Sequence, residues 1–508
     1  MLHRYVLTGI YLTLFAIIAV PAYSQTELLD PGSDQEPAYL SLNDCLEIAD
    51  VSNISLQRTR IGVGLSLLER MRAESVFDPG FELDLSGGSA RRSGGTGSTG
   101  TNSNMDFGAR YNLPTTIGGS WVFSLDQTRD WGSTTTDQQS VNFTTYNTQL
   151  GLTYSMPLFE GSGDFINRVG IIKSNISINR AELSVNEAKR GLRASIIEAY
   201  VNAVLAAVRI DVALLSLETA SALVDEVQAR IDVGQLAEYE LLSAQSGLAE
   251  RQESLINANS AFQTSLDTLK NLTGIPISRE IGIDTDFLTP LKSEYLFDEL
   301  FIQAQRNRRD LDDLDLRLQQ AELDRMLAAD RVQPSLTWNT VMGLSGEGGS
   351  YSRSIESVGD FNWFTGLSYK IPLGGNRAAR ADFQSSGLNI DQINLEKTDF
   401  LRNLERDIRS ALENLSNANL RIDVTEEGLH VQEIKLERER QRFSLGLITS
   451  RDLLDFDLEL ANAHLAYYRA MADSILAVSR IEFLVNDSFL PDSILLNTDY
   501  YEDGQITQ

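Results

Sequence analysis

The chain has 508 residues, of which 42% are hydrophobic and 22% are charged, so it can bury a large core and does not have the composition of a disordered protein. Its 71 acidic and 43 basic residues give a net charge of -28, which disfavours a nucleic-acid binder, because such a protein needs a basic footprint. This length favours several domains, or one elongated architecture built by repetition.

Residues 1–24 have the pattern of a secretory signal peptide. An apolar run from Val6 to Val20 is followed at once by a small-residue cleavage pattern that ends at Ser24. The alternative is an uncleaved membrane anchor, but about 15 apolar residues are short for a membrane helix. We therefore predict an exported protein that is cleaved before Gln25.

The mature chain is predicted to begin with a helix at residues 41–76. The only cysteine, Cys45, lies in this helix, so no disulfide can form within the chain, and a structural role for its small side chain is expected. Beyond Val20 no stretch approaches the continuous apolar length of a membrane helix. Any membrane crossing by the mature chain is therefore predicted to use strands.

Residues 79–157 show the period of two that is typical of half-apolar strands. Apolar residues alternate with mostly polar ones over 81–85 and again over 121–125. A polar loop rich in Gly, Ser and Thr is expected at 87–104. The interval has room for four strands, at about 80–90, 105–112, 119–129 and 141–156.

Residues 164–231 and 236–272 are predicted to form a long helix and a shorter one. Their apolar residues recur every seven positions, which keeps one seam facing a neighbour if the helices supercoil. A compact bundle is the alternative, but bundle helices usually have about 8–20 residues, and 164–231 contains no proline. The recurring residues are Ile196, Ala203, Ile210, Leu217, Val224 and Ile231, then Leu241, Leu248, Leu255, Phe262 and Leu269.

Residues 273–293 are interpreted as a linker, after which residues 294–487 repeat the first copy, residues 41–272. The second copy is predicted to contain helices at 294–331, 376–445 and 450–487 and strands at 334–373, with a polar loop at 345–358. Residues 488–508 form a polar tail without a periodic pattern. The patterns that recur in the same order are Arg70-Met71-x-Ala73 and Arg325-Met326-x-Ala328, Gly151–Leu158 and Gly366–Leu373, and Arg230-x-x-x-Gly234 and Arg442-x-x-x-Gly446.

The helix lengths predict that the helices form the wall of a tall tube. At 1.5 Å per residue each long helix spans about 100 Å and each shorter one about 55 Å, so two short helices end to end match one long helix. The strands follow a signal peptide and carry Trp and Tyr near their ends, which favours a transmembrane barrel over a soluble sandwich. One chain supplies too few strands to close such a barrel, and lipid does not tolerate an open edge, so identical neighbours must complete it.

Several short patterns together are typical of one known family. They are Leu40-Ser-Leu42 and Asn53, Arg308-Arg-Asp310-Leu311, the Tyr-x-x-Pro-Leu strand ends at 154–158 and 369–373, and the two Arg-x-x-x-Gly turns. On these residues the sequence resembles the TolC family of outer-membrane efflux channels over nearly the whole mature chain. Ile54 and Arg309 stand where the family commonly has proline, and Cys45 replaces a usual alanine.

The resemblance implies an α+β membrane protein, in which a long coiled-coil α-helical barrel and a transmembrane β-barrel are both completed by trimerisation. It implies a homotrimer in the outer membrane of a Gram-negative-type envelope, with a large periplasmic portion that meets an adaptor (membrane fusion) protein and an inner-membrane pump. Four strands per protomer would make a twelve-stranded barrel. Because 79–157 alone has room for four strands, the count stays open between four and six.

The candidate site lies at the turn after Gly446. Asp452 and Asp455 are three residues apart on one helix face, and the resemblance places them in an acidic selectivity ring at the periplasmic entrance, where clustered carboxylates favour cations. The alternative for Asp452 is a first-turn residue that offsets the helix dipole. In the first copy Glu240 matches Asp452, but Ser243 replaces the second acid.

The same two turns are where the resemblance implies that adaptor tips dock. Family members lock their closed state with polar links near this turn, for which the reference channel uses a tyrosine and an arginine. Phe443 and Ile448 stand at those two positions here, so this way of locking the closed state is not carried over. The predicted docking residues are Gly234, Gln235, Leu236, Gly446, Leu447 and Ile448.

The predicted function is that of the outer-membrane channel of a tripartite efflux system, which conducts substrates passively. An outer-membrane component of type I protein secretion is the alternative within the channel class, and a non-transporting coiled-coil scaffold of the envelope is the alternative outside it. An enzyme is not expected, because the mature chain has only His430 and His464 and no zinc, P-loop or nucleophile-elbow spacing. No cofactor and no metal are expected.

Overall fold

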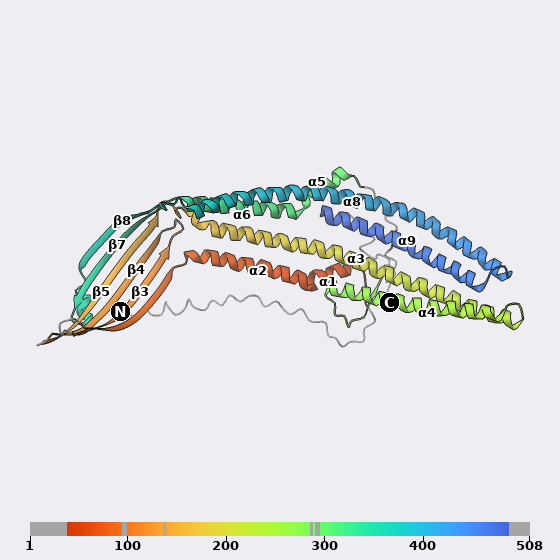
Figure 1. Ribbon diagram of the computed structural model, residues 1–508, viewed down its shortest axis with the longest axis horizontal. Helices are drawn as coiled ribbons and strands as arrows, with labels where there is room; N and C mark the ends of the chain where they lie inside the picture. The colour runs from red at the N-terminus through yellow and green to blue at the C-terminus, as the bar shows by residue number, and fades with distance from the viewer. Residues whose placement is uncertain (1–37, 94–98, 137–138, 285–287, 290–294, 487–508) are drawn as a thin grey trace, which may run out of the picture.

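The computed structural model describes residues 38–93, 99–136, 139–284, 288–289 and 295–486. The predicted signal peptide and the tail at 488–508 lie outside the described residues. Figure 1 shows a curved rod with a β-sheet at one end and two helical hairpin turns at the other.

The helices form four columns that run side by side from the sheet to the turns (Figure 1). Two columns are the single long helices α3 (Asp164–Asp232) and α8 (Arg377–Ser444). The other two are stacked pairs, α2 (Ile54–Glu74) with α4 (Glu238–Thr273), and α6 (Arg309–Val332) with α9 (Ser450–Val485). Column α3 lies between the two stacked pairs, and α8 packs on α6 and α9.

Two of the shorter helices are broken, although the sequence predicts one helix at 41–76 and one at 294–331. The first break is Asn53, between α1 (Leu42–Ser52) and α2, and its side chain accepts a hydrogen bond from the backbone N–H of Leu56 at 2.8 Å. The second is Arg308, between α5 (Phe297–Asn307) and α6. Both residues have extended backbone conformations, so each starts a new helix.

The seven-residue pattern describes the packing of α8 better than that of α3. On α8 the residues Ile408, Leu415 and Ile422, which follow one another at the same spacing of seven, are buried. On α3 the predicted Leu217 and Val224 are only partly buried, whereas Ala213, Ser216, Ala220, Leu223 and Val227 are buried instead. The predicted Ile196 and Ala203 are buried, so the seam is confirmed in that part of α3. Beyond Ala203 the buried stripe is offset from the predicted seam, because α3 packs against both α4 and α9 and two neighbours set it.

Within α3, one stretch of 18 residues is apolar enough to pass a test for membrane helices by length and composition alone, and 44% of that stretch is buried inside the protein. Core helices pass the same test. We interpret the stretch as the part of α3 that packs in the largest apolar cluster, which also contains Cys45. Burial, and then the neighbouring Asp44, raise the pKa of the Cys45 thiol to about 12.

The sheet contains six strands in the order β2-β3-β4-β5-β7-β8, and all neighbours are antiparallel. The two strands of the second half are β7 and β8, where the resemblance also implies two. The first half supplies four strands instead of the two that the resemblance implies. The bounds are β2 (Gly80–Ser93), β3 (Thr99–Pro114), β4 (Ser120–Thr136), β5 (Gln139–Pro157), β7 (Ser335–Gly348) and β8 (Asp360–Lys370).

Both predicted polar loops are wrong in part. Strands β2 and β3 extend through most of 87–104, because their backbones pair although most side chains there are small or polar. The predicted loop at 345–358 contains the end of β7 and a short helix, α7 (Tyr351–Glu356). The predicted linker also holds structure, since β6 (Ile281–Ile283) pairs in parallel with β1 (Ala38–Leu40).

Candidate functional site at the helix turns

The two helical hairpins turn at the end of the rod that lies farthest from the sheet (Figure 1). The repeated Arg-x-x-x-Gly pattern is the C-terminal cap of each long helix. Gly234 and Gly446 have φ of 77° and 71°, a left-handed conformation that glycine adopts without strain. The backbone N–H after each glycine donates to the carbonyl of the pattern's arginine, at 2.8 Å for Arg230 and 3.0 Å for Arg442. The pattern therefore fixes where each turn begins.

Asp452 takes part in a capping box at the start of α9. Its carboxylate accepts from the backbone N–H of Thr449 at 2.9 Å and from the Thr449 hydroxyl at 2.8 Å, and its own N–H donates to that hydroxyl. The hydrogen bond from the backbone N–H of Thr449, followed by that from its hydroxyl, holds the pKa of Asp452 below its ordinary value. The side chain is nevertheless exposed, so the cap leaves it facing solvent as an anion.

Asp455 lies one helical turn further along and is also exposed. The structure thus places both predicted ring residues on the exposed surface of α9, just beyond the turn. Of the predicted docking residues, Gly234, Gln235, Gly446 and Leu447 are exposed. Leu236 and Ile448 are partly buried against an apolar cluster that joins the two hairpins.

Glu240 connects the two hairpins. Its buried carboxylate accepts from the backbone N–H of Ser450 at 3.0 Å and from the Ser450 hydroxyl. Burial alone would raise the pKa of Glu240, but the hydrogen bonds from Ser450 and Tyr239 outweigh it and lower the pKa. An anion of the first hairpin therefore sits at the N-terminus of α9, where the helix dipole is positive.

Arg230 makes the reciprocal contact at the other end of the turn. Its guanidinium donates to the carbonyl oxygen of Phe443 at 3.2 Å and lies 5.0 Å from the centre of the Phe443 ring. It also pairs with Glu226 on its own helix. An arginine of α3 thus satisfies a carbonyl at the C-terminus of α8, where the dipole is negative.

Further from the turn, close packing and a buried acid join α3, α4 and α9. A β-carbon at Gly247 would lie 2.3 Å from Cδ1 of Leu454, so a larger residue at this contact between α4 and α9 would require the Leu454 side chain to move. The Ser216 hydroxyl donates to the buried carboxylate of Asp457. Burial raises the pKa of Asp457, although Ser216 and Arg251 partly oppose that rise.

These links were not visible in the sequence. Glu240 was paired with Asp452 by its place in the repeat, yet its partner is Ser450, 210 residues away. Asp457 and Ser216 are likewise 241 residues apart. A polar residue within a heptad pattern, such as Asp457, was the only available signal.

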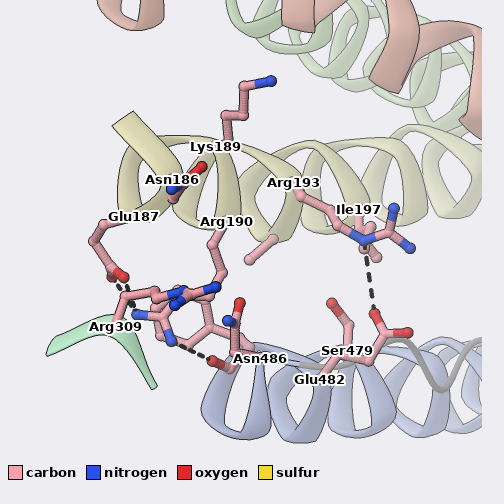
Figure 2. A pocket seen from close by; sticks show the side chains of 12 residues that line it. Asn186, Glu187, Lys189, Arg190, Arg193, Ile197, Arg309, Ser479, Glu482 and Asn486 are labelled. Carbon is pink, nitrogen blue, oxygen red and sulfur yellow. Dashed lines mark hydrogen bonds and ion pairs between the residues drawn. The ribbon is translucent and has the colours of Figure 1, made fainter. Parts of the chain in front are cut away.

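A second polar cluster lies midway along the columns, around the Arg308-Arg-Asp310 pattern (Figure 2). Arg190 of α3 donates to the carbonyl of Phe483 at 3.0 Å and pairs with Glu187 and Asp310. Arg308 pairs with Asp310 at 2.6 Å. These bonds hold the C-terminus of α9 against α3 and the start of α6, so we interpret the cluster as structural.

Comparison with known proteins agrees with this architecture. Residues 300–486 match the family described as outer membrane efflux protein. No match was found among curated protein sequences. No group of three or more His, Cys, Asp or Glu residues able to hold a metal occurs in the described part of the chain.

The fold is similar to those of several solved outer-membrane proteins. VceC of Vibrio cholerae has a TM-score of 0.66 at 16% identity, over 88% of this chain and 97% of that one. The CmeC channel of Campylobacter jejuni has 0.65 at 16%, over 90% of each chain. The open state of the MtrE channel of Neisseria gonorrhoeae has 0.62 at 15%, over 90% and 94%.

Proposed function

We propose that this chain, which carries the outer membrane efflux protein domain and has the fold of the TolC-like outer-membrane channels, is the channel component of a tripartite efflux system. The matched family and fold are those of channel proteins of the outer membrane, with a large periplasmic part. Passive conduction and assembly with an adaptor protein and an inner-membrane pump are our proposal.

The observation that best supports the proposal is the sheet at the end of the helical columns. Two successive rows of side chains on one of its faces are apolar in all six strands, and they include the exposed Phe81, Phe123 and Trp363. Such a face in water would be a liability, whereas facing lipid it is stable. The outer edges of β2 and β8 pair with no other strand among the described residues. Sister chains would satisfy them, which supports a homotrimer.

We propose that the helix turns form the periplasmic entrance. Asp452 and Asp455 are exposed beside the turn, and three copies would bring six carboxylates around one axis. Such a ring attracts cations and is blocked by multivalent ones. The exposed turn residues Gly234, Gln235, Gly446 and Leu447, together with Leu236 and Ile448, would receive the tips of the adaptor.

Planar-bilayer recordings test the entrance. The change Asp452→Asn with Asp455→Asn is expected to weaken cation preference and block by multivalent cations, because the ring loses its charge. A matched control with the same charge change, Asp391→Asn with Asp399→Asn in the sheet-proximal half of α8, is expected to leave both unchanged. Equal selectivity of the ring variant and the unmodified protein would contradict the entrance, and absence of any conductance would contradict a channel.

A further inference from the structure

The hairpin β3–β4 spans the full height of the sheet. Strand β3 pairs with β2 from Gly80 to Ser93, and β4 pairs with β5 from Ser120 to Thr136. Its turn, residues 115–119, lies level with the ends of the other strands on the helical side. There the backbone N–H of Gly163 donates to the carbonyl of Ile117 at 3.1 Å. The hairpin is therefore not a loop that projects beyond the far end of the sheet.

Side chains in β3 and β4 continue the apolar face of the other strands. Residues that are directly paired across the sheet lie on the same face, and two successive rows on one face are apolar in all six strands. The first row is Leu83, Ala109, Leu125, Leu150, Leu344 and Phe361. The second is Phe81, Tyr111, Phe123, Leu152, Met342 and Trp363.

The residues between these two rows point to the opposite face, where they are polar, charged or glycine. The row between the two apolar rows contains Glu82, Arg110, Ser124, Gly151, Gly343 and Asn362. Arg110, in β3, pairs with Asp84 of β2 at 2.8 Å and lies 3.7 Å from Asp126 of β4. The hairpin thus has one lipid-compatible face and one water-compatible face, as a strand pair in a membrane wall requires.

The widths of the sheet and of the helical part are similar when all six strands belong to the wall. Strands stand about 4.8 Å apart and tilt by about 40° in a barrel, so six cover roughly 38 Å of circumference and four roughly 25 Å. Four helical columns at about 9 Å spacing cover about 36 Å. A six-stranded segment therefore continues the arc of the four columns without a step.

We propose that the hairpin β3–β4 is part of the membrane wall, and that the exposed edge of β2 in each copy pairs with the edge of β8 in the next. The inference rests on the proposed trimeric channel, and three copies then close an eighteen-stranded barrel. Barrel diameter grows roughly linearly with strand number, so the lumen is about 1.5 times as wide as that of twelve strands. A barrel of this strand number is wide enough to leave an aqueous channel.

Fluorescence quenching tests the position of the hairpin, using full-length protein in phosphatidylcholine vesicles with brominated acyl chains. One variant carries Phe123→Trp in β4 with the four native tryptophans changed to phenylalanine. The matched control keeps only Trp363 in β8, which lies in the same row of the sheet. Since both rings face lipid at the same height, the two variants are expected to be quenched to the same extent.

The possible outcomes distinguish a failure of the eighteen-stranded wall from a failure of the proposed channel function. Quenching of Trp363 without quenching of the tryptophan introduced at position 123 would overturn the eighteen-stranded wall and leave the channel standing. Quenching of neither would overturn both. Cryo-electron microscopy of the protein in nanodiscs gives an independent count, with eighteen strands around a threefold axis expected and twelve contradicting the proposal. It needs no substitution and so does not depend on variant folding.

Discussion

The carboxylate of Glu240 joins the two hairpins through Ser450, and it carries a depressed pKa. The change Glu240→Gln keeps the shape but removes the charge at the N-terminus of α9, so we expect a loss of about 0.5–2 kcal/mol. The depressed pKa means that the stabilisation is present above the pKa of the unfolded chain and is lost as the pH falls through that of the folded protein. Thermal melting should therefore separate variant and parent at neutral pH, and the two should converge in acid.

A control for this prediction is Glu238→Gln, which removes an exposed charge from the same turn of α4. It should have little effect, because exposed charges contribute little. An equal loss of stability in the two variants would show that the contact with Ser450 is not the cause.

The pKa of Asp457 shifts in the opposite direction to that of Glu240, because burial raises it. A raised pKa means that the contribution to stability is complete below the pKa of the unfolded chain and is lost as the pH rises through that of the folded protein. The change Asp457→Asn keeps an acceptor for the Ser216 hydroxyl and removes the buried charge. We expect the variant to melt no lower than the parent at pH 7, with the difference shrinking toward acid.

The comparison variant is Asp457→Leu, which leaves the Ser216 hydroxyl without its acceptor. It should cost about 1–3 kcal/mol, the usual effect of an unsatisfied buried polar group. If the Asn variant were destabilised as much as the Leu variant, the buried charge itself would be favourable, and the prediction would be wrong.

Among the elements, the β3–β4 turn depends on a single glycine. Gly118 has φ of 91°, and a β-carbon there would lie 2.4 Å from the carbonyl oxygen of Gly161. We expect Gly118→Ala to cost about 1–3 kcal/mol through backbone strain and this clash, and to lower the temperature at which oligomers dissociate in detergent gels. Gly80→Ala is the control, since nothing lies within 4 Å of its β-carbon. Equal dissociation temperatures would indicate that the turn adapts.

Element type was predictable from the sequence where side chains carry a period. The seven-residue repeat indicated α8, whose residues Ile408, Leu415 and Ile422 are buried, and alternation at 121–125 indicated β4. The outer halves of β2 and β3 were not predictable, because the Gly, Ser, Thr and Asn residues there show no alternation of apolar and polar side chains, and the strands pair through the backbone and a few hydroxyl contacts. The breaks at Asn53 and Arg308 were not predicted, because Ile54 and Arg309 stand where the family commonly has proline, the residue that would have marked the first position of a new helix.

The site was predictable only in part, for a related reason. The turns followed from the Arg-x-x-x-Gly pattern, whose local hydrogen bonds are encoded within six residues. The links through Glu240, Arg230 and Asp457 join segments more than 200 residues apart, so they depend on how the columns pack. No local pattern distinguishes such a residue from an exposed one of the same type.

At the scale of the whole molecule, the net charge of -28 is distributed so that acids lie at both ends of the proposed pathway. Asp452 and Asp455 stand beside the turns, and Asp84 and Asp126 stand on the polar face of the sheet. Arg110 lies between the latter two and offsets them. A lumen built from this face should therefore favour cations, with Arg110 limiting the preference.

The change Arg110→Gln should strengthen cation preference, the opposite of the effect expected at Asp452 and Asp455. Loss of about 0.5–1 kcal/mol of repulsion toward a monovalent cation would raise the permeability ratio of cation to anion roughly twofold to fivefold. Reversal potentials under a potassium chloride gradient measure this ratio. Arg91→Gln removes the same charge from the opposite face of β2 and should leave the ratio unchanged. If Arg91→Gln rather than Arg110→Gln altered the ratio, the apolar face would line the pathway, and the orientation of the sheet would be reversed.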